Sequence, residues 1–301
     1  MTELRQVHDD ARAIAEAALG RDPGPLTTAE SISHRVYVGA DIVVKVIDAA
    51  GHSRLDREIA LVPHLPGGLT APLLAAGLHG QVRYACYARV PGKAPGMGMP
   101  AADAATARSL AVQAVQRLHA LHDWVPAGEA ERTLREPLDH GGFVGRAELI
   151  AEIERLTAAD RKAVVPAAAL DRLTAIAESA PPNVRMDVPV HADCHWGNWL
   201  ASGSDVTALL DFEWARFGDP VDDWFFVIAD SGPHVSTVLE VVARETTTSS
   251  DTLRAQCEVR EAAYLASDVR PALTRPDFPP RMFGERLRRL KEITIGRAWW
   301  R

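Results

Sequence analysis

Residues 188–214, VPVHADCHWGNWLASGSDVTALLDFEW, are the part of this chain that most constrains its fold. They form short β-rich runs separated by polar turns, whereas the sequence beyond Pro100 is otherwise mostly helical in its apolar spacing. A β excursion inside a helical region is a natural place for a functional site, because loops carry chemistry when a rigid scaffold positions them. We therefore expect the chemistry of the chain to centre on this stretch.

The first third of the chain has a different texture. HRVYVG and ADIVVKVID, at 34–48, are two β-branched runs about a Gly-Ala-Asp turn, a pattern typical of a hairpin. A helix is expected at 53–65, strand-like sequence follows at 81–90, and PGKAPG then breaks the pattern. The sequence thus predicts two lobes, a small α+β lobe at 1–90 with a hinge at about 87–92 and a larger, mainly helical lobe at 93–301.

Composition and charge argue against several classes of protein. The 301 residues carry a formal net charge of -7, which disfavours a broad nucleic-acid footprint. No apolar run approaches the roughly 18–20 residues of a membrane span, and the N-terminus lacks the layout of a signal peptide. The three cysteines are too widely spaced for a disulfide framework or a CxxC metal pair. We expect a cytoplasmic protein, monomeric or dimeric, that binds neither nucleic acid nor a membrane.

Three side chains of the 188–214 stretch have the spacing of a phosphoryl-transfer site. Asp193 and Asn198 lie five positions apart, and Asp211 follows at the end of the apolar run VTALL. Phosphoryl transfer needs a carboxylate for the attacking hydroxyl, hard oxygen ligands for Mg²⁺ and a cation for the nucleotide phosphates. Lys45, in the predicted strand VVKV, can supply that cation, with Glu58 on the next helix as its ion-pair partner.

The order of motifs resembles that of a known family. HxDxxxxN, followed by an apolar run and DFE, is similar to the Brenner-type motif and metal-binding aspartate of the aminoglycoside phosphotransferase and choline kinase families. VVKV, REIALVPHL, RYACYARVPG, RLHALH and GDPVDDW are similar to further segments of these families in the same order, so the resemblance covers nearly the whole chain. It implies a protein-kinase-like fold, with an antiparallel sheet and helix in the small lobe and a larger, mainly helical lobe.

The resemblance also implies residue roles. Asp193 would be the catalytic base, and Asn198 and Asp211 would ligate Mg²⁺. Lys45 would contact the α- and β-phosphates and be oriented by Glu58. The remaining assignments are Ser33 and His34 in the phosphate-covering loop, Tyr87, Ala88 and Val90 at the hinge that holds the base, and His191, Asp219 and Asp223 as supports of the catalytic loop.

Two segments depart from the family pattern. Its HGD is HAD in this chain, and we expect Ala192 to be tolerated there if the position has φ < 0. The phosphate-covering loop SISHRVYVG, at 31–39, has no glycine before Gly39, so its turn must use Ser31, Ser33 or His34.

Other interpretations of the same residues stay open. His191, Asp193 and His195 form an H-x-D-x-H string that resembles part of a binuclear metallohydrolase site, which needs further ligands from other loops. Cys194 as a nucleophile would leave the asparagine and the second aspartate unexplained. Lys45 alone would be typical of a strand edge that is protected from aggregation.

The substrates are constrained only in part. A bulky residue at the position of Tyr87 is associated in this family with use of GTP, so the donor is ATP or GTP. Residues 225–301 hold 10 Asp or Glu and 12 Lys or Arg, which gives little support to a polycationic acceptor. We predict a Mg²⁺-dependent O-phosphotransferase acting on a small-molecule hydroxyl, most simply an aminoglycoside, macrolide or nucleoside-type antibiotic. A metabolic kinase for choline, a sugar or a homoserine-like acceptor and a non-catalytic nucleotide-binding module are the alternatives, and the roles of Cys194, His195 and Trp299-Trp300-Arg301 stay open.

Overall fold

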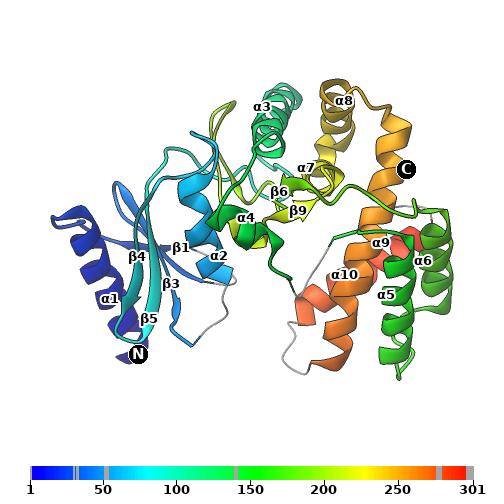
Figure 1. Cartoon of the computed structure of the whole chain (residues 1–301), viewed down its shortest axis with the longest axis horizontal. Helices are drawn as coiled ribbons and strands as arrows, with labels where there is room; N and C mark the ends of the chain where they lie inside the picture. The colour runs from blue at the N-terminus through cyan, green and yellow to red at the C-terminus, as the bar shows by residue number, and fades with distance from the viewer. Residues whose placement is uncertain are drawn as a thin grey trace.

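The computed structural model describes residues 2–29, 31, 34–50, 54–138, 142–275 and 280–295, with side chains from residue 9 onward. A lobe built on one sheet lies beside a lobe built mainly of helices (Figure 1). Ser33 and the C-terminal Trp299-Trp300-Arg301, which the sequence singled out, lie outside the described residues.

The small lobe is a five-stranded antiparallel sheet in the order β1-β2-β3-β5-β4. Its strands are β1 (Thr27–Ala29), β2 (Arg35–Val38), β3 (Ile42–Asp48), β4 (Leu73–His79) and β5 (Val82–Ala88). Alternate residues of β3 are buried against helix α1 (Thr2–Leu19). Lys45 therefore points to the opposite face of the sheet, where Ala85 and Tyr87 of β5 share its side.

Helix α2 (Arg54–Leu61) covers that second face and joins the two lobes. The short helix η1 (Val62–His64) follows it, and Leu55, Ala85 and Tyr87 belong to one buried cluster. From α2, Arg57 Nη1 donates to Glu136 Oε2 at 2.8 Å and its Nη2 donates to the backbone oxygen of Ala215 at 2.9 Å. Because both acceptors belong to the large lobe, α2 is held to both lobes.

The large lobe has two hydrophobic cores. The first gathers around α3 (Ala104–His122), α7 (Val221–Ala229) and α8 (Val235–Glu245), and contains the buried Trp196, Trp199 and Phe212. The second joins α5 (Arg146–Ala159), α6 (Ala167–Ser179), α9 (Ser250–Thr274) and α10 (Pro280–Thr294), which lie together in Figure 1. Two short helices, α4 (Glu129–Arg135) and η3 (Gly232–His234), complete the lobe.

The expected β excursion is present inside the helical lobe. Strand β6 (Val188–Val190) pairs with β9 (Arg216–Gly218), and β7 (Trp199–Ser202) pairs with β8 (Asp205–Leu209). The loop 191–198 leaves β6, and after the β7–β8 hairpin the chain returns beside it and continues into the short helix η2 (Phe212–Trp214). This path brings both ends of the predicted motif to one place.

Among the described helices, none alone has the length and apolar composition to cross a membrane, and only the bent pair Val221–Ala229 with Gly232–Glu245 meets those criteria when joined.

Candidate active site

The loop 191–198 is anchored by two fully buried tryptophans, Trp196 within it and Trp199 at the start of β7. Trp196 Nε1 donates to the backbone oxygen of Val227 in α7 at 3.0 Å. Trp199 Nε1 donates to the backbone oxygen of Cys194 at 2.9 Å. The two indole N–H groups thus tie the loop to α7 and tie β7 back to the loop, which fixes the loop backbone.

Asp223, in the first turn of α7, holds the start of this loop. Its carboxylate accepts the backbone N–H of His191 at 3.0 Å and that of Ala192 at 2.7 Å. His122, at the end of α3, places Nε2 at 2.9 Å from the same carboxylate. Burial alone would raise the pKa of Asp223, but the hydrogen bond and charge of His122 and the nearby His191 hold it below the ordinary value. The loop is therefore braced by a buried, ionised carboxylate.

Ala192 has a left-handed backbone, so the negative φ on which its tolerance was expected to depend is not present. Its φ is +64°, not negative, although its side chain is almost fully buried. A left-handed non-glycine residue costs roughly 1–2 kcal/mol. The hydrogen bond from its N–H to Asp223 is what holds this conformation in place.

His191 acts on the backbone through both of its ring nitrogens. Nε2 lies 2.9 Å from the backbone oxygen of Leu210, and Nδ1 accepts the N–H of Asp193 at 3.2 Å. Only a neutral imidazole with its proton on Nε2 makes both bonds, and burial lowers the pKa of His191 accordingly. A ring with both nitrogens engaged cannot ligate a metal, so the metallohydrolase interpretation loses its first ligand.

Cys194 is not placed as a nucleophile. Its thiol is fully buried and Sγ donates to the backbone oxygen of Asp223 at 3.3 Å. Burial, with nearby carboxylates, raises the pKa of Cys194 well above the ordinary value, whereas a nucleophilic cysteine needs an accessible thiolate.

Asp193, Asn198 and Asp211 come together at the end of the β7–β8 hairpin. Asn198 Nδ2 donates to the backbone oxygen of Asp193 at 2.8 Å and to its Oδ2 at 3.2 Å. The N–H of Leu210 donates to the backbone oxygen of Asn198 at 2.8 Å, so Asp211 follows directly beside Asn198. His195 Nε2 lies 3.9 Å from Asp193 Oδ1 on another side of the carboxylate.

Lys45 joins the small lobe to this cluster. Its Nζ lies 2.8 Å from Glu58 Oε2 and 3.0 Å from Asp211 Oδ1. Burial would lower the pKa of Lys45, but the two carboxylates hold it above the ordinary value, so the ammonium stays charged. Burial would raise the pKa of Asp211, but Lys45 outweighs this and keeps it low. The site thus contains a buried ion triad that spans the two lobes.

The hinge residues lie beyond Lys45 on the same face of the sheet. The ring of Tyr87 is buried, and its centroid lies 5.8 Å from Lys45 Nζ. The N–H of Ala88 donates to the backbone oxygen of Pro72 at 2.9 Å. Val90 follows two residues later in the segment that leaves the sheet.

His34, which directly precedes β2, lies close to Asp211 and Glu213. Its Nε2 lies 3.6 Å from Glu213 Oε2, and both side chains are buried. One ligand atom each from His34, Asp211 and Glu213 lies within 4.8 Å of the others, a set that could hold a cation. Burial and the nearby Asp211 raise the pKa of Glu213 to about 7.

Asp219 does not contact the catalytic loop in the way expected for a brace. Its Oδ1 accepts the N–H of Val221 at 2.9 Å and lies 3.3 Å from Arg260 Nη2. The neighbouring Asp222 is buried and pairs with Arg216 at 2.8 Å and with Arg260 at 3.3 Å. These charges fix the start of α7, and Asp223 is the member of the segment that reaches the loop.

His122 and the loop tryptophans are supports that the sequence did not reveal. RLHALH showed that histidines end a helix, but nothing in it pointed to a partner 101 residues away. The tryptophans stood in the motif itself, where only a structure shows that their N–H groups bind backbone oxygens.

Comparisons with known proteins agree with this geometry. Residues 28–259 match the model of the phosphotransferase enzyme family, APH. The GDP and kanamycin complex of APH(2")-IIia superposes with a TM-score of 0.71 at 17% identity, covering 94% of this chain and 98% of that one. APH(4)-Ia with AMP-PNP and hygromycin B gives 0.65 at 19%, covering 96% and 98%, and ADP-bound APH(2'')-Ib gives 0.67 at 14%, covering 97% and 99%.

No curated protein sequence matches the chain. At these identities the structural likeness establishes the fold, and it confirms the predicted kinase-like, two-lobed α+β architecture. The family match spans most of the chain and confirms the predicted class of enzyme. The chain therefore belongs to the phosphotransferase enzyme family, APH, whose members are kinase-type enzymes.

Proposed function

We propose that this enzyme transfers the γ-phosphoryl group of ATP or GTP to a hydroxyl of a small molecule, with Asp193 as the base. The observation that carries the proposal is the Lys45–Asp211 ion pair, 3.0 Å long and formed across 166 residues of sequence. It sets a cation of the small lobe beside the loop that holds Asp193 and Asn198. A phosphate chain between the lobes would meet that cation on one side and the base on the other.

Each residue then has one task in the transfer. Asp193 accepts the proton of the acceptor hydroxyl as the new O–P bond forms, and the bond from Pγ to the bridging oxygen breaks. The nucleoside diphosphate leaves with the electron pair of that bond, and the charge of Lys45 stabilises it. Electrostatic stabilisation and positioning of this kind supply most of the catalysis in phosphoryl transfer.

Asn198 and Asp211 fit a magnesium site. Both are oxygen-bearing side chains, and the amide nitrogen of Asn198 is engaged by Asp193, which leaves its oxygen as the donor that Mg²⁺ prefers. When bound, Mg²⁺ would neutralise charge on the nucleotide phosphates. Structural neighbours are complexes with GDP, ADP and AMP-PNP, which supports a nucleotide with either a guanine or an adenine base.

The acceptor that we propose is a hydroxyl-bearing antibiotic in the cytoplasm. Two structural neighbours are complexes with the antibiotics kanamycin and hygromycin B, which supports a resistance or self-protection role. A metabolic hydroxyl compound is the competing acceptor. Growth of a host that expresses the chain on antibiotic plates separates the two, because a metabolic kinase leaves sensitivity to every antibiotic unchanged.

The residue assignments are tested by two variants with different expected defects. Asp193→Ala should abolish phosphoryl transfer and keep nucleotide binding, whereas Asp211→Ala should weaken binding of the Mg-nucleotide itself. Asp187→Asn is a matched control, because that aspartate precedes β6 but its side chain is 73% exposed. Full activity of Asp193→Ala would overturn the proposed base, and binding without any transfer by the unchanged chain to a broad acceptor panel would favour a non-catalytic module.

A further inference from the structure

The catalytic loop carries two histidines whose ring nitrogens are used differently. His191 is fully buried, and both of its nitrogens engage backbone groups. The side chain of His195 is 28% exposed, and its Nδ1 accepts the N–H of Gly197 at 3.1 Å. A neutral imidazole whose Nδ1 accepts a hydrogen bond carries its proton on Nε2. His195 therefore presents an N–H donor from a position that a ligand can reach.

That donor lies beside the proposed base. His195 Nε2 is 3.9 Å from Asp193 Oδ1, whereas Asn198 Nδ2 donates to the other carboxylate oxygen, Oδ2, at 3.2 Å. A separation of 3.9 Å is too long for a direct hydrogen bond. It fits a hydroxyl oxygen about 2.8 Å from each atom, because a hydroxyl can donate to the carboxylate and accept from the imidazole. The gap between the two side chains thus has the size and polarity of one hydroxyl group.

The local backbone fixes the imidazole of His195 in this position. The N–H of Asn198 donates to the backbone oxygen of His195 at 2.8 Å, which closes a tight turn. The ring lies against Gly197, where a Cβ atom would come within 2.9 Å of both Cε1 and Nδ1. Because Gly197 does not have a positive φ, its backbone conformation suits other residues, and it is the imidazole that excludes a side chain there.

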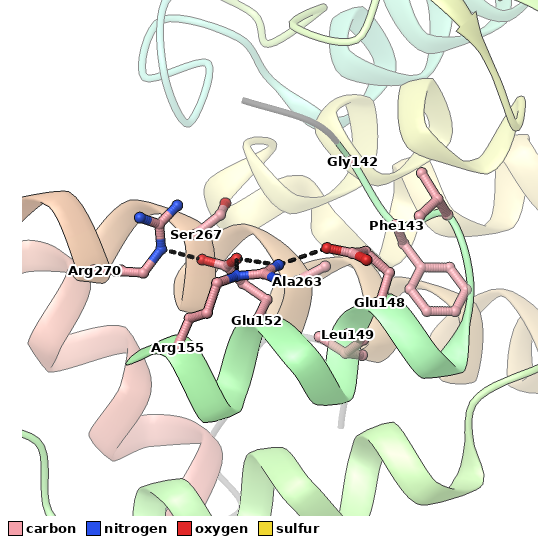
Figure 2. A pocket seen from close by; sticks show the side chains of 10 residues that line it. Gly142, Phe143, Glu148, Leu149, Glu152, Arg155, Ala263, Ser267 and Arg270 are labelled. Carbon is pink, nitrogen blue, oxygen red and sulfur yellow. Dashed lines mark hydrogen bonds and ion pairs between the residues drawn. The ribbon is translucent and has the colours of Figure 1, made fainter. Parts of the chain in front are cut away.

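The cavity of about 360 Å³ between α5 and α9 does not supply such a pair of groups. Among the described residues that line it, none belongs to the loop 191–198. Figure 2 shows its carboxylates joined to arginines, and Glu152 for instance pairs with Arg155 at 2.7 Å and with Arg270 at 2.6 Å. The reacting hydroxyl has to lie within reach of Asp193, so its second hydrogen-bond partner belongs to the loop rather than to this cavity.

We infer that His195 binds the acceptor hydroxyl together with Asp193, as the donor that directs its oxygen toward the γ-phosphoryl group. The hydroxyl proton passes to Asp193 as the new O–P bond forms and the bond from Pγ to the bridging oxygen breaks. His195 Nε2 keeps its own proton throughout. In a loose transition state the attacking oxygen needs positioning more than activation, so a hydrogen bond that fixes its direction aids the transfer. This inference rests on the proposed function and gives it a second residue that contacts the acceptor.

Two amide side chains separate this role from that of holding the turn. In His195→Gln the amide nitrogen reaches the position of Nε2, but a carbon atom takes the place of Nδ1. In His195→Asn the carbonyl oxygen replaces Nδ1 as the acceptor for Gly197, but the side chain ends short of Asp193. Asparagine therefore rescues a residue that only holds the turn, whereas glutamine rescues one that orients the hydroxyl.

Water is the acceptor probe, because it is the smallest hydroxyl compound, and phosphate release from GTP and from ATP with Mg²⁺ measures the transfer in the full-length chain. We expect kcat to fall about tenfold in His195→Ala and in His195→Asn, as for the loss of one hydrogen bond. In His195→Gln the fall should be less than about threefold, and KM for the nucleotide should stay unchanged in all three variants.

Gly197→Ala gives an independent test, because the added methyl group displaces the imidazole. It should lower kcat as far as His195→Ala does. The double variant should be no slower than His195→Ala alone, because the ring that the methyl group displaces is already absent.

The outcomes separate the inference from the function on which it rests. Full kcat in a folded His195→Ala chain, rescue by asparagine but not by glutamine, or a proton on Nδ1 of His195 in NMR of isotope-labelled histidine each overturns the inference. Equal phosphate release by the unchanged chain and by Asp193→Ala overturns the proposed function instead. For a chain that binds GDP but releases no phosphate, the tightening of GDP binding by fluoroaluminate, a mimic of the transferred group, replaces kcat in the same comparisons.

Discussion

Asp223→Asn changes one atom in the carboxylate that holds the catalytic loop, and its effect follows from the contacts. The two oxygens of Asp223 accept the N–H groups of His191 and Ala192 at 3.0 and 2.7 Å, and one of them also meets His122. An asparagine can turn its single oxygen toward only one of the backbone donors. Its NH₂ group then faces the other donor, in a position that is fully buried.

The expected loss of stability is several kcal/mol. A hydrogen bond to a charged group contributes about 1.5–3 kcal/mol, and a buried donor left unsatisfied costs a further ~1–3 kcal/mol. Two weakened bonds and one orphaned N–H give about 3–5 kcal/mol, against a total stability of roughly 5–15 kcal/mol for a native protein. The variant should therefore fold at low temperature and unfold at a lower urea concentration.

The activity should fall as well, because Ala192 loses the bond that holds its left-handed backbone. A shift of about 1 Å in Asp193 is enough to lower kcat by about 10²-fold. The pKa of Asp223 is lowered in the folded state, so its contribution is present above the unfolded value of about 3.9 and is lost as pH falls through the folded value. Acid unfolding of Asp223→Asn should accordingly be less steep below about pH 4.

Urea denaturation followed by circular dichroism, with kcat measured at low temperature, tests this expectation. Asp171→Asn, an exposed change of the same kind in α6, is the control and should stay within about 0.5 kcal/mol of the unchanged protein. A loss of less than about 1 kcal/mol in Asp223→Asn together with an unchanged kcat would refute the assigned brace.

Three further outcomes follow from single residues. Ala192→Gly should change the free energy of unfolding by less than about 1 kcal/mol, because relief of the left-handed strain offsets the lost burial and the added chain entropy. Ala192→Val should lower the free energy of unfolding by more than about 2 kcal/mol in the same urea assay. The pKa of His191 is lowered by burial, so its stabilising effect is complete above about pH 6.5 and is lost as pH falls through the folded value. Thermal melts of His191→Gln should therefore depend less on pH below about pH 6.5. Tyr87→Ala should raise the rate with ATP relative to GTP in initial-rate assays, and a strong ATP preference of the unchanged protein that is insensitive to this substitution would contradict the steric role.

The features set by local periodicity could be predicted from the sequence. The alternation in VVKV fixes the face of β3 on which Lys45 lies, because side chains of a strand alternate between its two sides. The change from period-two to helical spacing separates the lobes, and the β-rich runs at 188–214 mark the excursion that carries the loop. Each of these depends on residues that are close in the chain.

The features that were missed or wrong depend on contacts between distant segments. Tolerance of alanine at position 192 was expected to require a negative φ, but Ala192 has a positive φ, and its N–H is held by Asp223, 31 residues away. The same holds for His122, whose position in α3 carries no local sign of its bond to that aspartate. A brace is recognised only when both of its ends are placed in space.

The number of acidic and basic residues in a segment does not by itself predict the charge that a ligand meets there. The 10 acidic and 12 basic residues of 225–301 suggested a surface of slightly positive sign. In the structure, Arg289 pairs with Glu261 and Arg286 pairs with Asp268, so part of that charge is neutralised within the fold. A ligand therefore meets only the charges that ion pairs within the fold leave unneutralised. The number of acidic and basic residues in a segment therefore does not predict the charge at a site, because the charge at a site depends on which side chains the fold has already paired.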